Sequence, residues 1–446
     1  MNKIQLNKHW LNQIFIGLTF ILALFPILTF GLRSIITIVW VLCGILNTFR
    51  LNTKTKKKKR DLIFLIVSIL PFIYLCITLF YSENFNLGQR RIVQMLPFFL
   101  FPIIFYLNKD QFRAKQLQNI CWFFSVSVII LVLYQILYSL FRLDFLMAEL
   151  SNEEIVRNLL SEKKLLNEDV VSEVKIRRFR SFLLDITDTH FTYQGLWIIF
   201  SIFFLSKLGF QKFKLKKYKG LLLFSISLIL MVWLFLISSR MPIIAMVIAA
   251  FYVMFVLGRI TIKYQLLLLL VTLLFLNISY FVFTPFRVRA NEIFKTKFEF
   301  PTESRGSYSY SSVNVRNGIY FCVSRIAKEH IMFGVGVGDS QDELNKCYND
   351  KIGAKIYTWK DYNTHNQYFF FLVASGLIGA VLFLALLYLH WKTATNRSNP
   401  TYLYFITIIG LISLTENILS RSDGVMFFAF FSGLFLFNIN ELNDNN

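Results

Sequence analysis

Thr364-His365-Asn366-Gln367 ends a long polar segment and leads into the apolar run FFFLVASGLIGAVLFLALLYL at residues 369–389. As a helix, a run of this length can cross the roughly 30 Å hydrocarbon core of a bilayer. Similar runs of about 18 or more residues recur along the chain, and they are continuous rather than alternating. Because membrane-spanning strands alternate apolar and polar residues, the pattern predicts an all-α polytopic membrane protein.

The composition agrees with this prediction. Of the 446 residues, 56% are hydrophobic, and the mean hydropathy is +0.55. In a soluble protein the formal net charge of +21 would suggest a nucleic-acid partner. In a membrane protein, Lys and Arg gather instead in cytoplasmic loops. The Lys-rich stretches at 53–60 and 212–219 fit that interpretation, so we expect no nucleic-acid partner.

Assigning the basic loops to the cytoplasm gives a topology of about twelve spans with both termini inside. The chain, 1–446, would form a single integral membrane domain. Two longer segments, 142–191 and 285–365, would face the outer side, the second of them between the ninth and tenth spans. The expected spans are 12–30, 34–49, 61–81, 92–107, 118–140, 192–207, 220–238, 242–258, 264–284, 367–390, 401–417 and 424–438.

Arginines on the outer side are the informative basic residues. Arg90 and Arg91 end the expected loop 82–91, and Arg240 lies in a short turn between two spans, where Ser238 and Ser239 would add donors. Arg is costly near hydrocarbon and rarely stays there without a partner or a function. Its planar guanidinium suits a diphosphate, whereas interfacial snorkelling is the alternative. We expect all three arginines to bind substrate, Arg240 foremost.

Residues 313–339, VNVRNGIYFCVSRIAKEHIMFGVGVGD, predict an amphipathic helix followed by a Gly-rich turn. Arg316 lies in the first turns of that helix. Gly334, Gly336 and Gly338 permit positive φ or close backbone approach. Because no strand precedes the turn and no helix follows at the required spacing, it is not a dinucleotide site. We expect Gly336 to form the turn, with phosphate binding as the alternative.

Cysteine and acidic residues predict little further chemistry. Cys322 and Cys347 share the large outer segment, so a disulfide is one expectation and two thiols are the other. Asp185, Asp188 and His190 come nearest to a metal-binding cluster, but the match is weak. These residues therefore predict no metal site, whereas the expectation that no cofactor is needed follows from the family resemblance described below.

His365 is the leading catalytic candidate. It lies at the start of a span, where the field of a helix N-terminus meets the headgroup region. A neutral imidazole there could take a proton from a hydroxyl nucleophile. Asn366 beside it is a substrate-binding candidate. His190, in a similar position at the mouth of the sixth span, is the second candidate after His365 and is also expected to bind substrate.

Together these motifs resemble the O-antigen ligase family of bacterial membrane glycosyltransferases, which also includes glycan polymerases and protein O-oligosaccharyltransferases. Beyond the layout of the spans, the likeness rests on S-S-R-M-P at 238–242, R-x-x-x-Y at 316–320 with F-G-V-G-V-G at 333–338, and T-H-N-Q-Y at 364–368 with S-G-L-I-G at 375–379. One difference concerns an acidic residue that family members often carry after the His. The matching stretch here is Ala374-Ser375-Gly376.

The resemblance implies a GT-C-like fold in the bacterial inner membrane, with the outer segments in the periplasm. It implies metal-independent, inverting transfer of a glycan from undecaprenyl diphosphate to an acceptor hydroxyl, such as one on lipid A-core. Arg240 and Arg316 would hold the diphosphate, His365 would act as the base, and the lipid tail would lie among the spans. The acceptor stays open between a glycolipid, a growing glycan and a protein. A lipid-linked glycan transporter, which would carry ionisable groups in mid-membrane, is a further alternative.

Overall fold

The computed structural model describes residues 2–51, 59–151, 154, 168–258, 262–295, 299–301, 312–359 and 361–438. Throughout these residues the regular structure is helical. The α-helices are α1 (Asn2–Leu22), α2 (Phe30–Leu51), α3 (Lys59–Thr78), α4 (Phe85–Gln94), α5 (Leu96–Leu107), α6 (Ala114–Phe141), α7 (Leu143–Met147), α9 (Glu168–Thr187), α10 (Phe191–Leu215), α11 (Lys217–Leu236), α12 (Arg240–Val256), α13 (Ile262–Val282), α14 (Thr284–Lys295), α15 (Ser312–Glu329), α16 (Ser340–Cys347), α17 (Gln367–Asn396), α18 (Pro400–Ile412) and α19 (Ser422–Asn438). Short helical turns are η1 (Phe25–Ile27), η2 (Leu79–Tyr81), η3 (Lys109–Gln111), η5 (Tyr348–Ile352), η6 (Lys355–Thr358) and η7 (Ile418–Ser420).

The length and composition of the helices make the chain a multi-pass membrane protein. Among the described residues, seven helical segments are long and apolar enough to cross a membrane, and four apolar helices of 10–17 residues accompany them. The prediction of an all-α membrane protein is confirmed. The count of about twelve spans and the side of the membrane that each loop faces stay predictions.

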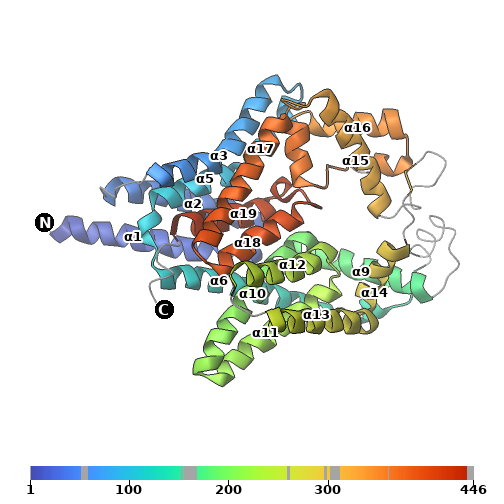
Figure 1. Ribbon diagram of the computed structural model, residues 1–446, viewed down its shortest axis with the longest axis horizontal. Coiled ribbons are helices and arrows are strands. Elements are labelled where there is room, and N and C mark those ends of the chain that lie inside the picture. Colours follow the sequence, from blue (N-terminus) through green and yellow to red (C-terminus); the bar gives the residue numbers. More distant parts are fainter. Residues whose placement is uncertain are drawn as a thin grey trace.

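The centre of the bundle is α19 (Figure 1). All of its residues from Asp423 to Asn438 are buried, and it packs against α5, α10, α17 and α18. Its run VMFFAFFSGLFLF at 425–437 is apolar on every face, as expected of a helix that other helices enclose. Aromatic rings fill the space around it, with the Phe431 ring 4.6 Å from that of Phe200 and 5.8 Å from that of Phe405.

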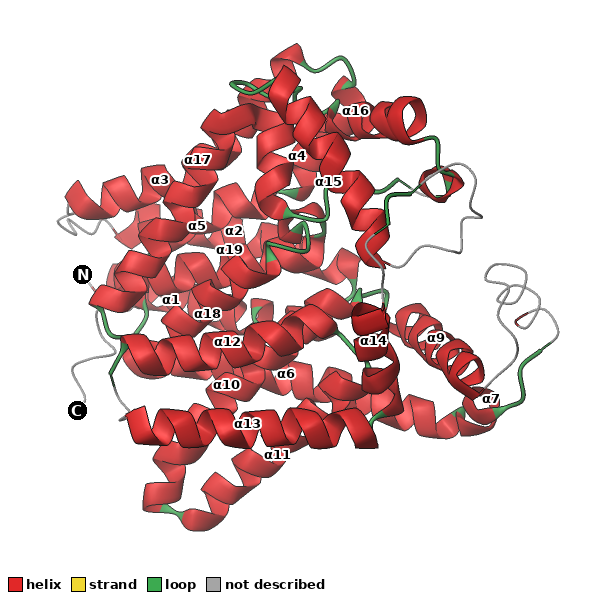
Figure 2. Ribbon diagram, turned by 45° about the vertical axis from the view of Figure 1, so that its right-hand side comes forward, coloured by secondary structure: helices red, strands yellow, loops and turns green. Residues whose placement is uncertain are grey.

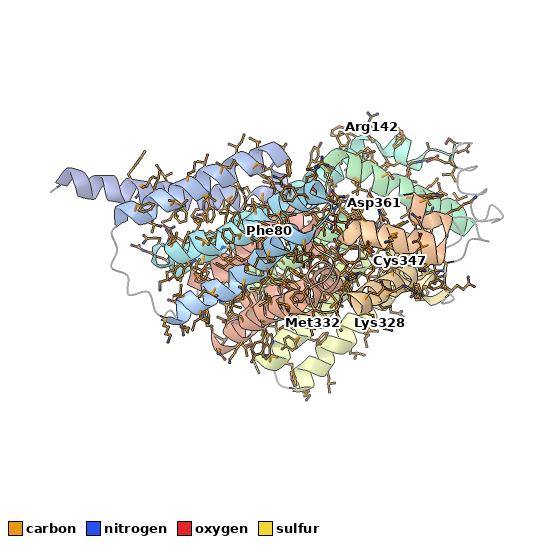
Figure 3. The ribbon with its side chains drawn as sticks, turned by 90° about the horizontal axis from the view of Figure 1, so that it is seen from above. Phe80, Arg142, Lys328, Met332, Cys347 and Asp361 are labelled. Atoms are coloured by element: carbon orange, nitrogen blue, oxygen red, sulfur yellow. A yellow bond between two sulfur atoms is a disulfide. The ribbon has the colours of Figure 1, made fainter. Side chains whose placement is uncertain are left out.

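Helices α9, α14, α15 and α16 gather at one end of the molecule, which we call the polar end. They lie at the right of Figure 1, whereas α1 begins at the left, and Figure 2 shows the same grouping. In Figure 3, Cys347 and Asp361 also lie away from the beginning of α1. The polar end corresponds to the two segments, 142–191 and 285–365, that the sequence predicts to lie outside the membrane.

A second, smaller core forms at the polar end. Helices α15 and α16 and the turns η5 and η6 enclose Ile319, Val323 and Tyr348, which are nearly inaccessible to solvent. A disulfide joins Cys322 of α15 to Cys347 at the end of α16, with their Cα atoms 5.8 Å apart. Of the two expectations for these cysteines, the bonded state is therefore the one found.

The Gly-rich turn fits into a break in α17. Gly376 interrupts that helix with φ +63° and ψ −164°, so nearby main-chain groups lose their helical partners. The turn supplies new ones through Val335 N to Val373 O at 2.9 Å, Gly336 N to Ala374 O at 3.0 Å, and Leu377 N to Ile331 O at 2.8 Å. Gly336 has φ +99° and forms this turn, as expected.

The expected loop 82–91 is mostly helical, because α4 begins at Phe85. Asn84 caps the helix, its Oδ1 accepting from Leu87 N at 3.1 Å. The Asp339 carboxylate in turn accepts from Glu83 N at 2.9 Å and Asn84 N at 2.7 Å. These contacts fix the start of α4 against the end of the Gly-rich turn.

The expected span 401–417 is too long, because α18 ends at Ile412. After this residue the chain turns back toward the start of α17, and main-chain groups of Ser413 and Leu414 accept hydrogen bonds from that helix rather than continuing α18. Glu416 and Asn417 consequently lie in a turn between α18 and α19, the α18–α19 turn at residues 413–421.

Candidate active site

The Thr364–Gln367 stretch faces the α18–α19 turn, where Glu416 brings two predicted site residues together. Glu416 Oε2 lies 3.9 Å from His365 Nδ1, and Glu416 Oε1 lies 3.9 Å from Arg316 Nη2. Both separations are longer than a hydrogen bond, and the one between Glu416 and Arg316 is that of an ion pair. The three side chains are 18–31% exposed, so they are reachable from solvent but partly shielded from it. One carboxylate thus links the proposed base to a proposed diphosphate ligand.

A set of hydrogen bonds holds the α18–α19 turn against the start of α17. The bonds run from Thr364 Oγ1 to Asn417 Oδ1 (3.0 Å), Asn366 N to Asn417 Oδ1 (2.7 Å), Asn366 Nδ2 to Leu414 O (3.0 Å), Gln367 N to Ser413 O (2.8 Å) and Leu419 N to Gln367 Oε1 (2.8 Å). Most of the groups involved are buried, where an unpaired partner would be costly. The contact between His365 and Glu416 therefore rests on a fixed framework.

The backbone at His365 has an unusual conformation. Its φ is +43°, in the left-handed region that few residues other than glycine adopt. His365 N donates to Asn363 Oδ1 at 2.9 Å, and Asn366 caps α17 by accepting from Tyr368 N at 2.9 Å. The ring therefore lies just before the N-terminus of α17. Strained backbone of this kind often marks a functional position.

The start of α10 connects Arg240 to the same neighbourhood. Thr192 Oγ1 lies 3.5 Å from Glu416 Oε1, and Ser239 Oγ donates to Phe191 O at 3.2 Å. Because Arg240 is the first residue of α12 and follows Ser239, its turn packs against the helix start that contacts Glu416. Arg240, Arg316 and His365 are thus carried by elements that meet at one place.

His190 and the two serines make hydrogen bonds within the protein, and substrate binding by His190 stays a prediction. His190 precedes α10 as its cap, and its Nδ1 accepts from Thr192 N at 3.4 Å. Ser238 Oγ donates to Pro285 O at 2.8 Å, and Ser239 Oγ donates to Phe191 O. The serine hydroxyl hydrogens are therefore used within the protein, contrary to the expectation that they add donors for an anion.

The other predicted ligands lie around this centre. Arg91 Nη1 donates to Val337 O at 3.0 Å and to Ser340 Oγ, so it holds the Gly-rich turn. Asn366 caps α17 and binds the α18–α19 turn, while Arg90 is exposed on α4. The contacts of Arg91, Asn366 and Gly336 are architectural, and substrate binding by any of these residues stays a prediction.

The nearby tyrosines do not compete with His365 as a base. Burial raises the pKa of Tyr362, whose ring centroid lies 6.3 Å from that of His365. Burial also raises the pKa of Tyr320, against an opposing effect of the Arg316 charge. Both phenols therefore stay protonated at neutral pH. Within the part of the chain that the structure describes, no three His, Cys, Asp or Glu side chains form a group that could hold a metal ion.

Sequence reasoning missed Glu416 and Asn417. The available signal was the polar trio Thr415-Glu416-Asn417, which interrupts the apolar pattern at the end of an expected span. The acidic residue expected by family likeness near Ala374 is absent, and the carboxylate facing His365 comes instead from a turn close to the C-terminal end of the chain.

A comparison with protein families matches residues 220–384 to the O-antigen ligase family. The matched segment contains Arg240, Arg316 and His365 and ends before Glu416. No curated protein matches the chain. The predicted family likeness is thus confirmed over these residues, and the chain carries an O-antigen ligase domain. That family comprises membrane glycosyltransferases of the ligase and polymerase type, which transfer lipid-linked glycans.

Proposed function

We propose that this chain, with its O-antigen ligase domain at residues 220–384, transfers a glycan from undecaprenyl diphosphate to an acceptor hydroxyl at the periplasmic face of the bacterial inner membrane. The observation that carries the proposal is the position of Glu416, 3.9 Å from both His365 Nδ1 and Arg316 Nη2. A base and a cation that share one carboxylate suit a reaction in which a proton is accepted while negative charge develops on a leaving group.

His365 acts as the general base in this proposal. Its Nε2 takes the proton of the acceptor hydroxyl as that oxygen attacks the anomeric carbon of the glycan. Its Nδ1 faces Glu416, so the carboxylate stabilises the imidazolium that forms. General-base assistance of this kind contributes about 10²–10⁴-fold to the rate.

Arg316 and Arg240 act on the leaving group. As the bond between the anomeric carbon and the diphosphate oxygen breaks, the electron pair departs with undecaprenyl diphosphate. Guanidinium groups bind such oxygens bidentately and stabilise the developing charge. Attack from the side opposite the diphosphate inverts the anomeric carbon. Because the glycosyl diphosphate is already activated, the reaction as proposed needs neither a nucleotide nor a metal ion.

The lipid tail of the donor has an apolar groove available to it. A groove of about 720 Å³ lies between α6, α7, α9, α11 and α14 and has almost entirely apolar walls. Leu228, Ile229 and Leu236 of α11 line it, and α11 ends at Leu236, just before the turn that leads to Arg240. A polyprenyl tail in this groove would bring its diphosphate toward Arg240.

The central experiment measures transfer by His365→Ala and Arg240→Ala variants reconstituted with lipid-linked glycan. We expect both to lose about 10²-fold or more of the wild-type rate and to accumulate the donor in cells. His330→Ala is the matched control, because His330 lies exposed in the same outer segment. Full transfer by either site variant, with normal folding and membrane insertion, would refute the mechanism.

The acceptor requires a separate experiment. A ligase, a polymerase and a protein oligosaccharyltransferase share the donor and the chemistry proposed above. In a deletion strain, loss of long glycan chains with retention of single attached units would identify a polymerase, whereas loss of all attached glycan would identify a ligase. Loss of glycan from protein alone would identify the oligosaccharyltransferase.

A further inference from the structure

A small polar pocket lies beside the Thr364–Gln367 stretch. It has a volume of about 180 Å³ and is enclosed by α4, α16, the segment 361–364 and the α18–α19 turn. Its wall includes Arg91, Asp361, Asn363, Phe370 and Asn417. Asn363 and Thr364, which both line the pocket, directly precede His365, so the pocket adjoins the proposed catalytic base.

Asn417, which lines this pocket, carries a buried hydrogen-bond donor that the described protein does not use. The side chain is only 2% exposed. Its Oδ1 accepts from Asn366 N at 2.7 Å, and since a main-chain N–H can only donate, the orientation of the amide is fixed. Nδ2 is therefore the opposite group, and it has no hydrogen-bond partner in the described protein. A buried amide N–H without an acceptor lowers the stability of the fold unless a ligand accepts its hydrogen bond.

The remaining wall combines both kinds of polar group with an apolar face. Among the described residues, the hydrogen bonds of Arg91 involve Nη1 alone, which leaves Nε and Nη2 as donors. Asp361 offers a carboxylate, of which Oδ1 accepts from Asn345 Nδ2. Phe370 contributes a ring, with the Arg91 guanidinium carbon 6.0 Å from its centre. The Asp361 carboxylate would repel an anionic ligand, and the Arg91 guanidinium would repel a cationic one. The pocket therefore suits a neutral molecule.

A sugar residue has this combination of properties. Its hydroxyl groups both donate and accept hydrogen bonds, and its C–H face packs against aromatic rings. A volume of about 180 Å³ also far exceeds the roughly 30 Å³ share of one water molecule. We infer that the pocket is a subsite for one neutral sugar residue of the glycan beside the reacting bond. This inference rests on the proposed function, and the sugar comes from either the donor or the acceptor.

The test blocks the pocket without touching the catalytic groups. Gln94 is exposed, lines the pocket, and donates from Nε2 to Ser420 O at 2.8 Å. Gln94→Trp would fill the opening. Val93→Trp places the same bulk on the adjacent, exposed position of α4 outside the pocket. We expect Gln94→Trp to raise one KM by about fivefold or more, the scale of a lost hydrogen bond, with kcat little changed and with Val93→Trp like wild type.

Two titrations distinguish the source of the sugar. Varying the donor at fixed acceptor, and the acceptor at fixed donor, shows which KM rises. Asn417→Asp serves as a second variant, because it keeps the oxygen that accepts from Thr364 and Asn366 and replaces the amide donor by an acceptor. It should raise the same KM. An active wild type with both KM values unchanged in the two variants would overturn the inference and leave the proposed function standing.

Direct binding separates failure of the inference from failure of the function. The probe is the neutral oligosaccharide released by mild acid from the lipid-linked donor of the same cells, titrated calorimetrically into the full-length protein. If the wild type transfers no glycan but binds this probe, and Gln94→Trp abolishes binding while Val93→Trp does not, the subsite stands without the proposed function. If the wild type does not bind the probe, the pocket holds ordered water only and the inference is wrong.

Discussion

Glu416→Gln is the most direct test of the proposed site, because it removes a charge and preserves size. Two charges about 4 Å apart interact by about 4 kcal/mol at the effective dielectric of a protein surface and by about 1 kcal/mol in bulk water. Glu416 lies 3.9 Å from His365 Nδ1, and the two side chains are 18% and 28% exposed, so an intermediate value applies. A loss of about 1–3 kcal/mol corresponds to about a 5- to 150-fold fall in kcat.

The assay is steady-state glycan transfer by purified protein reconstituted in lipid. The fall should appear mainly in kcat, because Glu416 stabilises the imidazolium that forms only as the proton is transferred. A smaller rise in the donor KM should accompany it, since Arg316 loses the same carboxylate. Glu329→Gln is the control, because Glu329 is an exposed residue at the other end of α15 whose carboxylate lies 3.4 Å from Arg325.

A double variant provides the sharpest refutation. If Glu416 acts through His365, adding Glu416→Gln to His365→Ala should cost little further activity, because the group that it assists is already gone. Independent, multiplicative losses would show that Glu416 does not act through His365. A Glu416→Gln variant with the wild-type kcat would likewise show that Glu416 does not assist His365.

Three further changes test other parts of the molecule. Cys322 and Cys347 are 25 residues apart, and replacing both with serine should lower the free energy of unfolding by about 3 kcal/mol. The loss is measured as a lower Tm, and wild-type protein in dithiothreitol should show the same Tm as the variant. A variant with the wild-type Tm would contradict the disulfide. Gly376→Ala should lower the free energy of unfolding by more than about 1 kcal/mol, because φ is +63° and the added methyl group would meet the backbone of the Gly-rich turn. Gly410→Ala is the control. A methyl group there would have no heavy atom closer than 3.6 Å, so its Tm should be unchanged or higher. Leu228→Trp should raise the KM for an undecaprenyl-linked donor but not for one with a short isoprenoid chain; equal effects on both would exclude the groove as the tail site.

The helices of the bundle could be predicted from the sequence because a bilayer imposes a length and a composition on whatever crosses it. The run at 369–389 became most of α17, and the run at 425–437 became α19. The Gly-rich turn after α15 was likewise predictable, since glycines at 334, 336 and 338 leave few alternatives. In contrast, the Lys-rich stretch at 53–60 lies largely outside the described residues.

The partner of His365 could not be predicted, because the contact depends on where α18 ends. Hydropathy alone extends that span to residue 417. The actual end at Ile412 is set by main-chain acceptors that bind the start of α17, and Asn366 and Asn417 are 51 residues apart in sequence. The break at Gly376 was hidden for a similar reason, since a glycine in an apolar run does not reveal that another segment will bind the main-chain groups beside it.

The turn between the last two helices also determines how the molecule can be divided. Residues 220–384 match the O-antigen ligase family and hold Arg240, Arg316 and His365, yet the carboxylate and the amide beside His365 belong to residues 416 and 417. A chimera built by transplanting only the matched segment would inherit the base and both arginines and would take its acid from the recipient. Glu416 and Asn417 are consecutive and serve different partners. Deleting one residue before them would put Asn417 in the place of Glu416, and inserting one would put Glu416 in the place of Asn417. Chimeras intended to alter glycan specificity should therefore carry α18 and α19 together with the matched segment and keep the length of the turn between them.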